Sequence, residues 1–307
     1  MGNRVLITGG SGMIGRRLTE LLQEKGYTVH WLSRSAGKTN GVIKYPWNIE
    51  KKYIEDDAIL KTDYIIHLAG ANIFEKRWTD AYKKVIIESR TKSANLLLGK
   101  VKIFEQPIKA YITASGIDIY DSSCNEKGCN EQSPLGTDFL AEVCKKWEAC
   151  ADQFEKIGIR TVKIRTGVVL SESDGAFKKI LSTVSMGIGA PLGSGKQYFP
   201  WIHLDDLCNI YIHALENEKL KGAYNACAPE VTTNKELTKQ TAKLLGKPMF
   251  MPNVPAFALK LAFGAERAEL ILGGKKASPD KISKTGFKFK FPQLKEALGN
   301  LLNKNLV

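Results

Sequence analysis

The segment RVLITGGSGMIG, residues 4–15, constrains the fold of this chain more than any other feature. Val5, Leu6 and Ile7 form a short apolar run that predicts a buried parallel strand. Residues 16–26 then place leucines at helical spacing, so a helix is predicted to begin where the glycines end. A strand, a glycine-rich turn and a helix in this order are typical of the first unit of a doubly wound α/β sheet.

The glycine-rich turn also has the chemistry of a dinucleotide site. Glycines permit a tight turn in which the backbone approaches a pyrophosphate, and the first amides of the following helix favour negative charge. The alternative is a glycine turn in an unrelated α/β protein. We predict that the cofactor is bound here by Gly9, Ser11, Gly12, Met13, Ile14 and Gly15.

The composition is that of an ordinary globular protein. The chain has 307 residues, of which 43% are hydrophobic, which is enough for one large domain or a domain with a smaller lobe. No apolar run is long enough to span a bilayer, and no signal-peptide pattern precedes the first strand. We therefore expect a cytoplasmic protein without a membrane partner.

The six cysteines and four histidines do not predict a metal site, because no CxxC pair is present and histidine is scarce. A disulfide framework is not expected in such a chain, so the thiols are predicted to be reduced and mostly structural. Cys124 and Cys129 lie in a polar loop, where they could be exposed.

The net charge of +13 raises the hypothesis of nucleic-acid binding. The lysines are scattered through helices and loops, with some concentration at residues 275–304, and no nucleic-acid module accompanies them. A solvated lysine-rich surface, which also favours an anionic cofactor or substrate, is the better interpretation. We therefore expect no nucleic-acid partner.

Strand patterns and helix patterns alternate through the first two thirds of the chain. Strands are predicted at residues 28–32, 64–70, 110–115 and 160–169, and helices at 78–99 and 138–157. Further helices are predicted at residues 205–217, 234–246, 255–273 and 292–303. This order predicts an α/β protein with an NAD(P)-binding Rossmann fold, that is, a doubly wound parallel sheet, and a smaller, mostly helical C-terminal lobe.

The domain boundaries follow from this alternation. We place the Rossmann domain at residues 1–170, with residues 203–226 returning to it. Residues 171–202 and 227–307 are predicted to form the second lobe, which binds substrate and closes over the cofactor domain. The glycine- and proline-rich stretch at residues 187–195 is predicted to be a loop that packs over the ligand crevice.

The end of the second strand selects between NAD and NADP in dinucleotide folds. An acidic side chain there binds the 2′-hydroxyl of NAD, whereas an arginine accommodates the 2′-phosphate of NADP. Here the strand ends in Leu32, Ser33 and Arg34, and no acidic residue is present. Ser33 and Arg34 therefore predict NADP(H), the alternative being that Arg34 is an exposed arginine in a turn.

Three segments together resemble the extended short-chain dehydrogenase/reductase superfamily, which includes nucleotide-sugar epimerases. They are the glycine loop, residues 67–71 (HLAGA) and residues 201–206 (WIHLDD). The strings LAGANI at 68–73 and KRWT at 76–79 are similar to an atypical branch, NAD-dependent epimerase/dehydratase-like or sugar-nucleotide epimerase-like.

This resemblance covers essentially the whole chain and has two consequences for its parts. It implies that Leu68, Ala69 and Gly70 pass beneath the adenine side of the cofactor. It also implies that residues 254–302 are a C-terminal extension typical of the branch.

The catalytic pair of the superfamily is missing. A typical member uses a tyrosine as general acid/base, and a lysine four residues later lowers its pKa. Here the tyrosine position falls on Phe139 or Leu140, and the lysine position falls on Val143 or Cys144. The resemblance places the family's asparagine at Ser89.

Two hydroxyl groups remain as catalytic candidates. The resemblance places the family's serine at Ser115 or Gly116, and Tyr120 follows in the same segment. We predict Ser115 and Tyr120 as the catalytic residues, with a strand-end hydrogen bond and a packing tyrosine as the alternatives.

Other candidates surround the expected crevice. Arg165, at the end of a predicted strand, could support the nicotinamide end of the cofactor. An aromatic wall and a cation suit a nucleotide or a sugar phosphate, so the predicted substrate contacts are Trp78, Lys196 and Trp201. His67 follows two isoleucines and is predicted to be a satisfied core histidine rather than a base.

Two functions are consistent with this sequence. The first is an NADP(H)-binding oxidoreductase or epimerase-like protein that acts on a small molecule, such as a nucleotide sugar. The second is a non-catalytic NADP(H)-responsive regulator, which the missing catalytic pair favours. The sequence leaves the substrate and the assembly, including a homodimer, open.

Overall fold

The computed structural model describes residues 3–303. The chain divides into two compact units. Unit 1 consists of the residues up to Ile119 together with residues 138–165 and 208–224. Unit 2 consists of residues 120–137 and 166–207 and the residues from Asn225 onward.

Unit 1 is built on a nine-stranded sheet among the described residues, with the order β11-β8-β7-β6-β1-β2-β4-β3 and with β5 paired to β4. Its strands are β1 (Arg4–Thr8), β2 (Thr28–Ser33), β3 (Gly37–Thr39), β4 (Val42–Asn48), β5 (Tyr53–Ile54), β6 (Tyr64–His67), β7 (Ala110–Gly116) and most of β8 (Arg160–Thr166) and β11 (Gly222–Ala226), whose last residues belong to unit 2. The pairs β1–β2, β1–β6, β2–β4 and β6–β7 are parallel, so the carboxyl ends of these strands share one edge. The predicted Rossmann sheet is confirmed.

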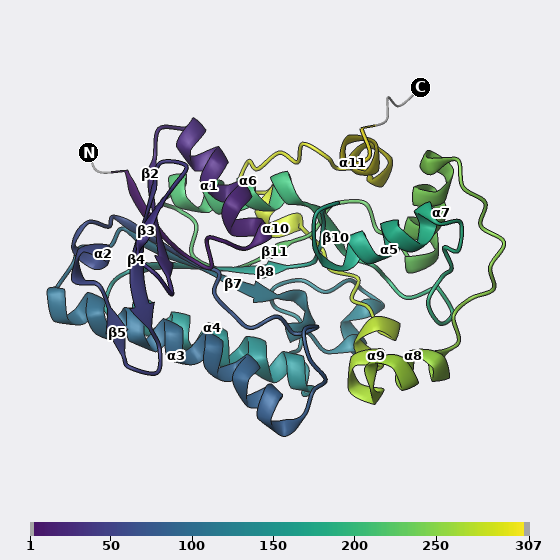
Figure 1. The fold of residues 1–307 in the computed structure, drawn as a ribbon, viewed down its shortest axis with the longest axis horizontal. Coiled ribbons are helices and arrows are strands. Elements are labelled where there is room, and N and C mark those ends of the chain that lie inside the picture. Colours follow the sequence, from purple (N-terminus) through teal and green to yellow (C-terminus); the bar gives the residue numbers. More distant parts are fainter. Residues whose placement is uncertain (1–2, 304–307) are drawn as a thin grey trace. The chain divides into compact units, whose positions relative to one another are not determined.

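Helices cover both faces of this sheet, with α3 and α4 on one face and α1 and α6 on the other (Figure 1). The helices of this unit are α1 (Met13–Glu24), α2 (Asp56–Leu60), α3 (Asp80–Phe104), α4 (Phe139–Glu155) and most of α6 (Leu204–Glu216), and a short turn, η1 (Ile117–Ile119), follows β7. Sheets of this kind bind ligands beyond the carboxyl ends of their strands, at the point where the strand order reverses. That point is β1, which lies between β6 and β2.

The sequence of α4 accounts for its position. Asp138 caps its N-terminus by accepting a hydrogen bond from the amide of Ala141 at 3.0 Å. Val143, Trp147 and Ala151 recur at helical spacing and are buried. The helix therefore presents one apolar stripe to the sheet.

Unit 2 holds a small parallel sheet of β9 (Val168–Leu170) and β10 (Trp201–His203). Its helices are α5 (Gly175–Ser185), α7 (Asn234–Leu245), α8 (Ala256–Phe263), α9 (Ala265–Leu272), α10 (Asp280–Ser283) and α11 (Leu294–Leu301), and a short turn, η2 (Ser122–Asn125), also belongs to it. Its core packs Phe177, Trp201 and Leu237 against one face of α11. The C-terminal part of the chain is helical, as predicted.

Two sequence predictions need correction. The single helix expected at residues 255–273 is two helices, because Gly264 between them adopts a φ of +85°, which an α-helix cannot continue through. Cys124 and Cys129 are neither exposed nor free thiols: both are buried and they form a disulfide. Their loop folds inward because Cys129 pairs with the backbone of residues 276–278.

Within residues 3–303 the structure contains no helix that combines the length and the apolar character needed to cross a membrane.

Candidate functional site

The glycine loop joins β1 to α1 at the carboxyl edge of the sheet. Gly9 has a φ of +72°, and its carbonyl accepts a hydrogen bond from the amide of Gly12 at 3.0 Å. A Cβ atom on Gly9 would lie 3.1 Å from the amide nitrogen of Ala69, so the loop runs close to the segment that follows β6. Glycine is thus required here both by the backbone conformation and by the close approach.

Two further glycines fix how the loop packs. A Cβ atom on Gly10 would lie 2.5 Å from the Trp31 ring of β2, and one on Gly15 would lie 2.5 Å from the Cα of Gly10. The indole of Trp31 also donates to the Thr19 hydroxyl of α1 at 2.9 Å. The loop is therefore held between β2 and the first turn of α1.

The start of α1 is open to a ligand. Gly12 is its N-cap and makes no side-chain capping hydrogen bond, and Ser11 and Gly12 are exposed. The first-turn residues Met13 and Ile14 are only partly buried. Free amides and the positive end of a helix dipole are what a pyrophosphate needs, so the loop residues fit this group.

A buried hydrogen-bond chain ties β1 to β6 behind the loop. The Thr8 hydroxyl accepts from the amides of Leu68 and Ala69, each at 3.1 Å, and lies 2.7 Å from Nδ1 of His67. The other ring nitrogen, Nε2, lies 3.1 Å from the Ser93 hydroxyl of α3. Burial lowers the pKa of His67 to about 4, so the ring is neutral at pH 7. His67 is a satisfied core histidine, as predicted.

The residues predicted to select NADP follow β2. Thr8 of β1 is paired with Leu32 of β2, so the loops after the two strands leave the same edge side by side. Ser33 is partly buried at the end of β2, and Arg34 is exposed directly after it. No carboxylate lies at residues 33–36, so nothing in this stretch opposes a 2′-phosphate.

The segment after β6 is held from α3. The amide of Ala71 donates to the Ser89 hydroxyl at 2.9 Å, and Gly70 beside it is exposed. Leu68 and Ala69 are held by Thr8, as described above. Thus the predicted cofactor residues lie in the loops after β1, β2 and β6. These strands are parallel neighbours, so the three loops leave the carboxyl edge of the sheet together.

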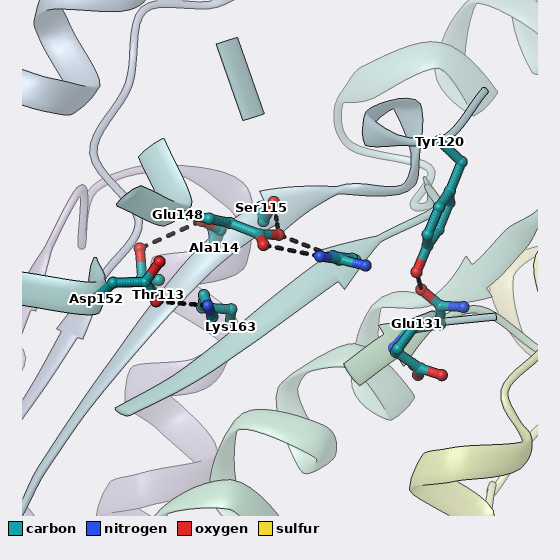
Figure 2. A network of polar contacts seen from close by, with 10 residues as sticks. Thr113, Ala114, Ser115, Tyr120, Glu131, Glu148, Asp152 and Lys163 are labelled. Carbon is teal, nitrogen blue, oxygen red and sulfur yellow. Dashed lines mark hydrogen bonds and ion pairs between the residues drawn. The ribbon is translucent and has the colours of Figure 1, made fainter. Parts of the chain in front are cut away.

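Ser115 lies at the carboxyl end of β7 and belongs to a buried polar network (Figure 2). Its hydroxyl donates to Oε1 of Glu148 on α4 at 2.7 Å. Arg165 at the end of β8 donates to both oxygens of Glu148, each at 2.8 Å. Arg165 therefore lies at the end of β8 and is paired with the Glu148 carboxylate, and its contact with the nicotinamide stays a prediction.

Glu148 was not among the sequence candidates. It lies on the apolar stripe of α4, next to Trp147 and three residues before Ala151, and only 6% of it is exposed. A carboxylate on the buried face of a helix is the signal that could have identified it.

Tyr120 belongs to unit 2 and is fully buried. Its hydroxyl donates to Oδ1 of Asn225 at 2.6 Å (Figure 2). The amide nitrogen of Asn225 in turn donates to the carbonyls of Cys129 and Ser278. This tyrosine holds a core network together, and we therefore do not retain it as a proton donor.

The positions of the missing catalytic pair are apolar. Phe139, at the tyrosine position, packs edge-on against Trp78 with 4.9 Å between ring centroids. Val143 is buried, and burial raises the pKa of the Cys144 thiol to about 12. Neither Val143 nor Cys144 provides the cation that the superfamily places here.

The predicted substrate residues are divided between the two units. Trp78 in unit 1 is partly buried, and its indole donates to the carbonyl of Ile73 at 2.7 Å. Lys196 in unit 2 is exposed in a loop. Trp201 is fully buried in the core of unit 2, so its side chain serves packing rather than contact with a substrate.

Within the part of the chain that the structure describes, His, Cys, Asp and Glu side chains form no cluster of the kind that could hold a metal ion.

Comparisons with known proteins identify the family of this chain. A family model described as "NAD dependent epimerase/dehydratase family" matches residues 5–227, and "Domain of unknown function (DUF1731)" matches residues 254–301. The epimerase family protein SDR39U1 of Mus musculus is 36% identical over 97% of this chain and 99% of its own length.

Two solved structures are similar over nearly the whole chain. The crystal structure of human epimerase family protein SDR39U1 (isoform 2) with NADPH has a TM-score of 0.87 and 35% identity, covering 98% of this chain and 99% of that one. A nucleoside-diphosphate sugar epimerase from Corynebacterium glutamicum has a TM-score of 0.78 and 29% identity, covering 98% and 58%. The family-specific extension predicted from residue 254 is confirmed. With its Rossmann sheet, its glycine loop and this C-terminal extension, the chain belongs to the NAD-dependent epimerase/dehydratase family.

Proposed function

We propose that this chain is an NADP(H)-binding oxidoreductase or epimerase-like protein of the extended short-chain dehydrogenase type that acts on a small molecule. The observation that carries the proposal is the arrangement at the carboxyl edge, where an open glycine loop lies beside Arg34 and no acidic residue follows β2. That the human relative was crystallised with NADPH supports the same cofactor. When bound, NADP(H) supplies hydride chemistry at its nicotinamide.

The proton chemistry falls to Ser115. Because the carboxylate of Glu148 can only accept hydrogen bonds, the Ser115 hydroxyl is its donor, and the lone pairs of Oγ remain for a ligand. Ser115 can therefore accept the proton of a substrate hydroxyl while its own proton moves to Oε1 of Glu148. In the reverse direction the protonated Glu148 returns a proton through Ser115 to a carbonyl oxygen. Arg165 holds the side chain of Glu148 in place for this transfer.

The substrate class is a small hydroxyl- or carbonyl-bearing molecule, with a nucleotide sugar as the first candidate. The Corynebacterium glutamicum protein that resembles this chain is described as a nucleoside-diphosphate sugar epimerase, which supports that candidate. Trp78 of unit 1 stays in the proposal as an aromatic wall for such a ligand.

A second function, NADP(H)-responsive binding without turnover, is favoured by Phe139 and Cys144. These apolar residues replace the tyrosine and lysine that handle protons in typical members, and Phe139 is packed against Trp78. Under this function the cofactor is bound in the same loop, and Ser115 serves as a hydrogen-bond acceptor only.

Two measurements separate these functions. Titration of the protein with NADPH, followed by the fluorescence of the bound nicotinamide, should show saturable binding under both. No binding at millimolar NADPH would exclude both. Single-turnover oxidation of bound NADPH across a library of carbonyl compounds should give a transient with at least one compound if the chain is an enzyme. Saturable binding without any transient would favour the regulator.

A further inference from the structure

Arg90 is a partly buried, charged side chain on α3 of unit 1. Its guanidinium lies over the ring of Trp147, 4.9 Å from the ring centroid. Its Nη1 donates to the carbonyls of Ile86 at 2.9 Å and Ala71 at 3.1 Å. Burial lowers the pKa of Arg90, yet the group stays a cation at neutral pH, because an arginine side chain remains protonated in proteins.

The surroundings of Arg90 leave that charge without an anion. Among residues 3–303, no carboxylate lies within 4.0 Å of its guanidinium, and its side chain donates hydrogen bonds only from Nη1. Two other arginines of unit 1 are satisfied: the buried Arg165 is paired with Glu148, and the partly buried Arg160 donates to four backbone carbonyls. A buried charge without a partner is costly unless a ligand supplies one.

The free edge of Arg90 faces the ligand side of the sheet. A Cβ atom on Gly70 would lie 2.8 Å from Cζ, 3.0 Å from Nη2 and 3.1 Å from Nε of Arg90, so the unused N–H groups lie against Gly70. Gly70 is exposed in the segment after β6, at the carboxyl edge. None of the buried side-chain atoms that lack a partner belongs to Arg90, so these N–H groups keep contact with solvent.

We propose that Arg90 binds an oxyanion, a phosphate or carboxylate group, of the ligand that occupies the carboxyl edge beside Gly70. The Nε–Nη2 edge of a guanidinium offers two parallel donors, which match two oxygens of such a group. The anion has two sources, the pyrophosphate of NADP(H) or an acidic group of the substrate. The location rests on the proposed function, whereas the anion-binding chemistry rests on Arg90 alone.

The test compares ligand binding by the wild-type protein with binding by Arg90→Met, Arg90→Lys and Gly70→Ala. Arg90→Met removes the charge and keeps the packing on Trp147. Gly70→Ala keeps the charge and displaces the guanidinium. Lys100→Met is the control, because Lys100 lies on the same helix and forms a surface ion pair with Asp56. Thermal unfolding of each variant establishes that it is folded. If Arg90→Met is not folded, Arg90→Lys replaces it in the comparison.

NADPH affinity and inorganic-phosphate affinity distinguish the two sources. If Arg90 binds the cofactor, Arg90→Met and Gly70→Ala raise the Kd of NADPH at least tenfold, while Lys100→Met leaves it unchanged. If Arg90 binds the substrate, NADPH affinity is kept, and the saturable binding of phosphate by the NADPH-loaded protein, measured by calorimetry, is lost in both variants.

The proposal is overturned if neither ligand distinguishes Arg90→Met from the wild type. If the wild-type protein binds no NADPH, the proposed function fails. Phosphate titration of the protein without cofactor then decides the role of Arg90: binding that depends on Arg90 supports it, and binding that is absent or independent of Arg90 overturns it.

Discussion

The hydroxyl of Ser115 lies 2.7 Å from Oε1 of Glu148, and Nε of Arg165 contacts the same oxygen from 2.8 Å. The three side chains come from β7, α4 and β8 and are all buried. An arginine with two bonds to a carboxylate holds that carboxylate in a fixed orientation. The hydroxyl proton of Ser115 is therefore directed to Glu148. The lone pairs of its oxygen are left to accept a hydrogen bond from a ligand at the end of β7.

Substitution of Glu148 by glutamine should destabilise unit 1 strongly. The change removes the negative charge with which the buried Arg165 is paired, and breaking a buried pair in this way costs about 3–5 kcal/mol. Urea denaturation should show the loss as a lower midpoint with an unchanged slope. Ser115→Ala removes one hydrogen bond only and should cost about 1 kcal/mol. Equal losses for the two variants would mean that Arg165 finds another partner.

Stability should fall on mild acidification because of His67. Its pKa is about 4 in the folded protein and 6.5 when unfolded, so the unfolded state binds the proton first as pH falls. The contribution of His67 to the free energy of unfolding is complete above pH 6.5. It declines by up to about 3 kcal/mol as the pH falls toward 4.

Denaturation measured at several pH values should show this decline. His30 and His213, whose pKa values burial also lowers, add to the slope in the wild type. His67→Gln is therefore compared with the wild type, and it should be less stable at pH 7 but less sensitive to pH. A variant with the full wild-type slope would assign the effect to the other histidines.

The fold could be predicted from sequence because its signals are local. The order of Val5–Ile7, the glycines and the leucines of α1 is readable in one stretch, and the stripe of α4 follows from its spacing. The break at Gly264 could not be read in the same way, because a second helix begins directly after it at Ala265. The pairing of Cys124 with Cys129 depends on how their loop folds against residues 276–278, which no local pattern reports.

In the candidate site, too, the residues marked by local sequence signals could be predicted, and those defined by contacts between distant residues could not. Gly9 and Arg34 are each next to a strand that the sequence marks, and parallel pairing brings them to one edge. Glu148 and Arg90 acquire their roles from contacts with residues far along the chain, Arg165 and Gly70. Tyr120 shows the converse, since a hydroxyl that looks reactive in sequence is used by Asn225 in the core.

Arg34 should determine the preference for NADPH over NADH. Its exposed guanidinium follows β2 and can pair with a 2′-phosphate, and a charged hydrogen bond of this kind is worth about tenfold in affinity. Arg34→Ala should weaken NADPH binding by about this factor and leave NADH binding almost unchanged. Fluorescence titration with both cofactors measures the ratio. An unchanged ratio would place the 2′-phosphate elsewhere.

Substituting Gly15 of the glycine loop by alanine should abolish cofactor binding, whereas the same substitution at Gly99, outside the loop, should leave binding intact. In Gly15→Ala the new Cβ atom meets the backbone of Gly10 at 2.5 Å, so the loop must move away from α1 and lose its phosphate-binding shape. Gly99 lies within α3 with nothing within 4 Å of its Cβ position, so Gly99→Ala adds the same group without a clash. It should retain NADPH binding and gain about 0.5–1 kcal/mol of stability from improved helix propensity. NADPH titration and urea denaturation of both variants check this contrast, and retention of wild-type affinity by Gly15→Ala would contradict the assignment of the loop.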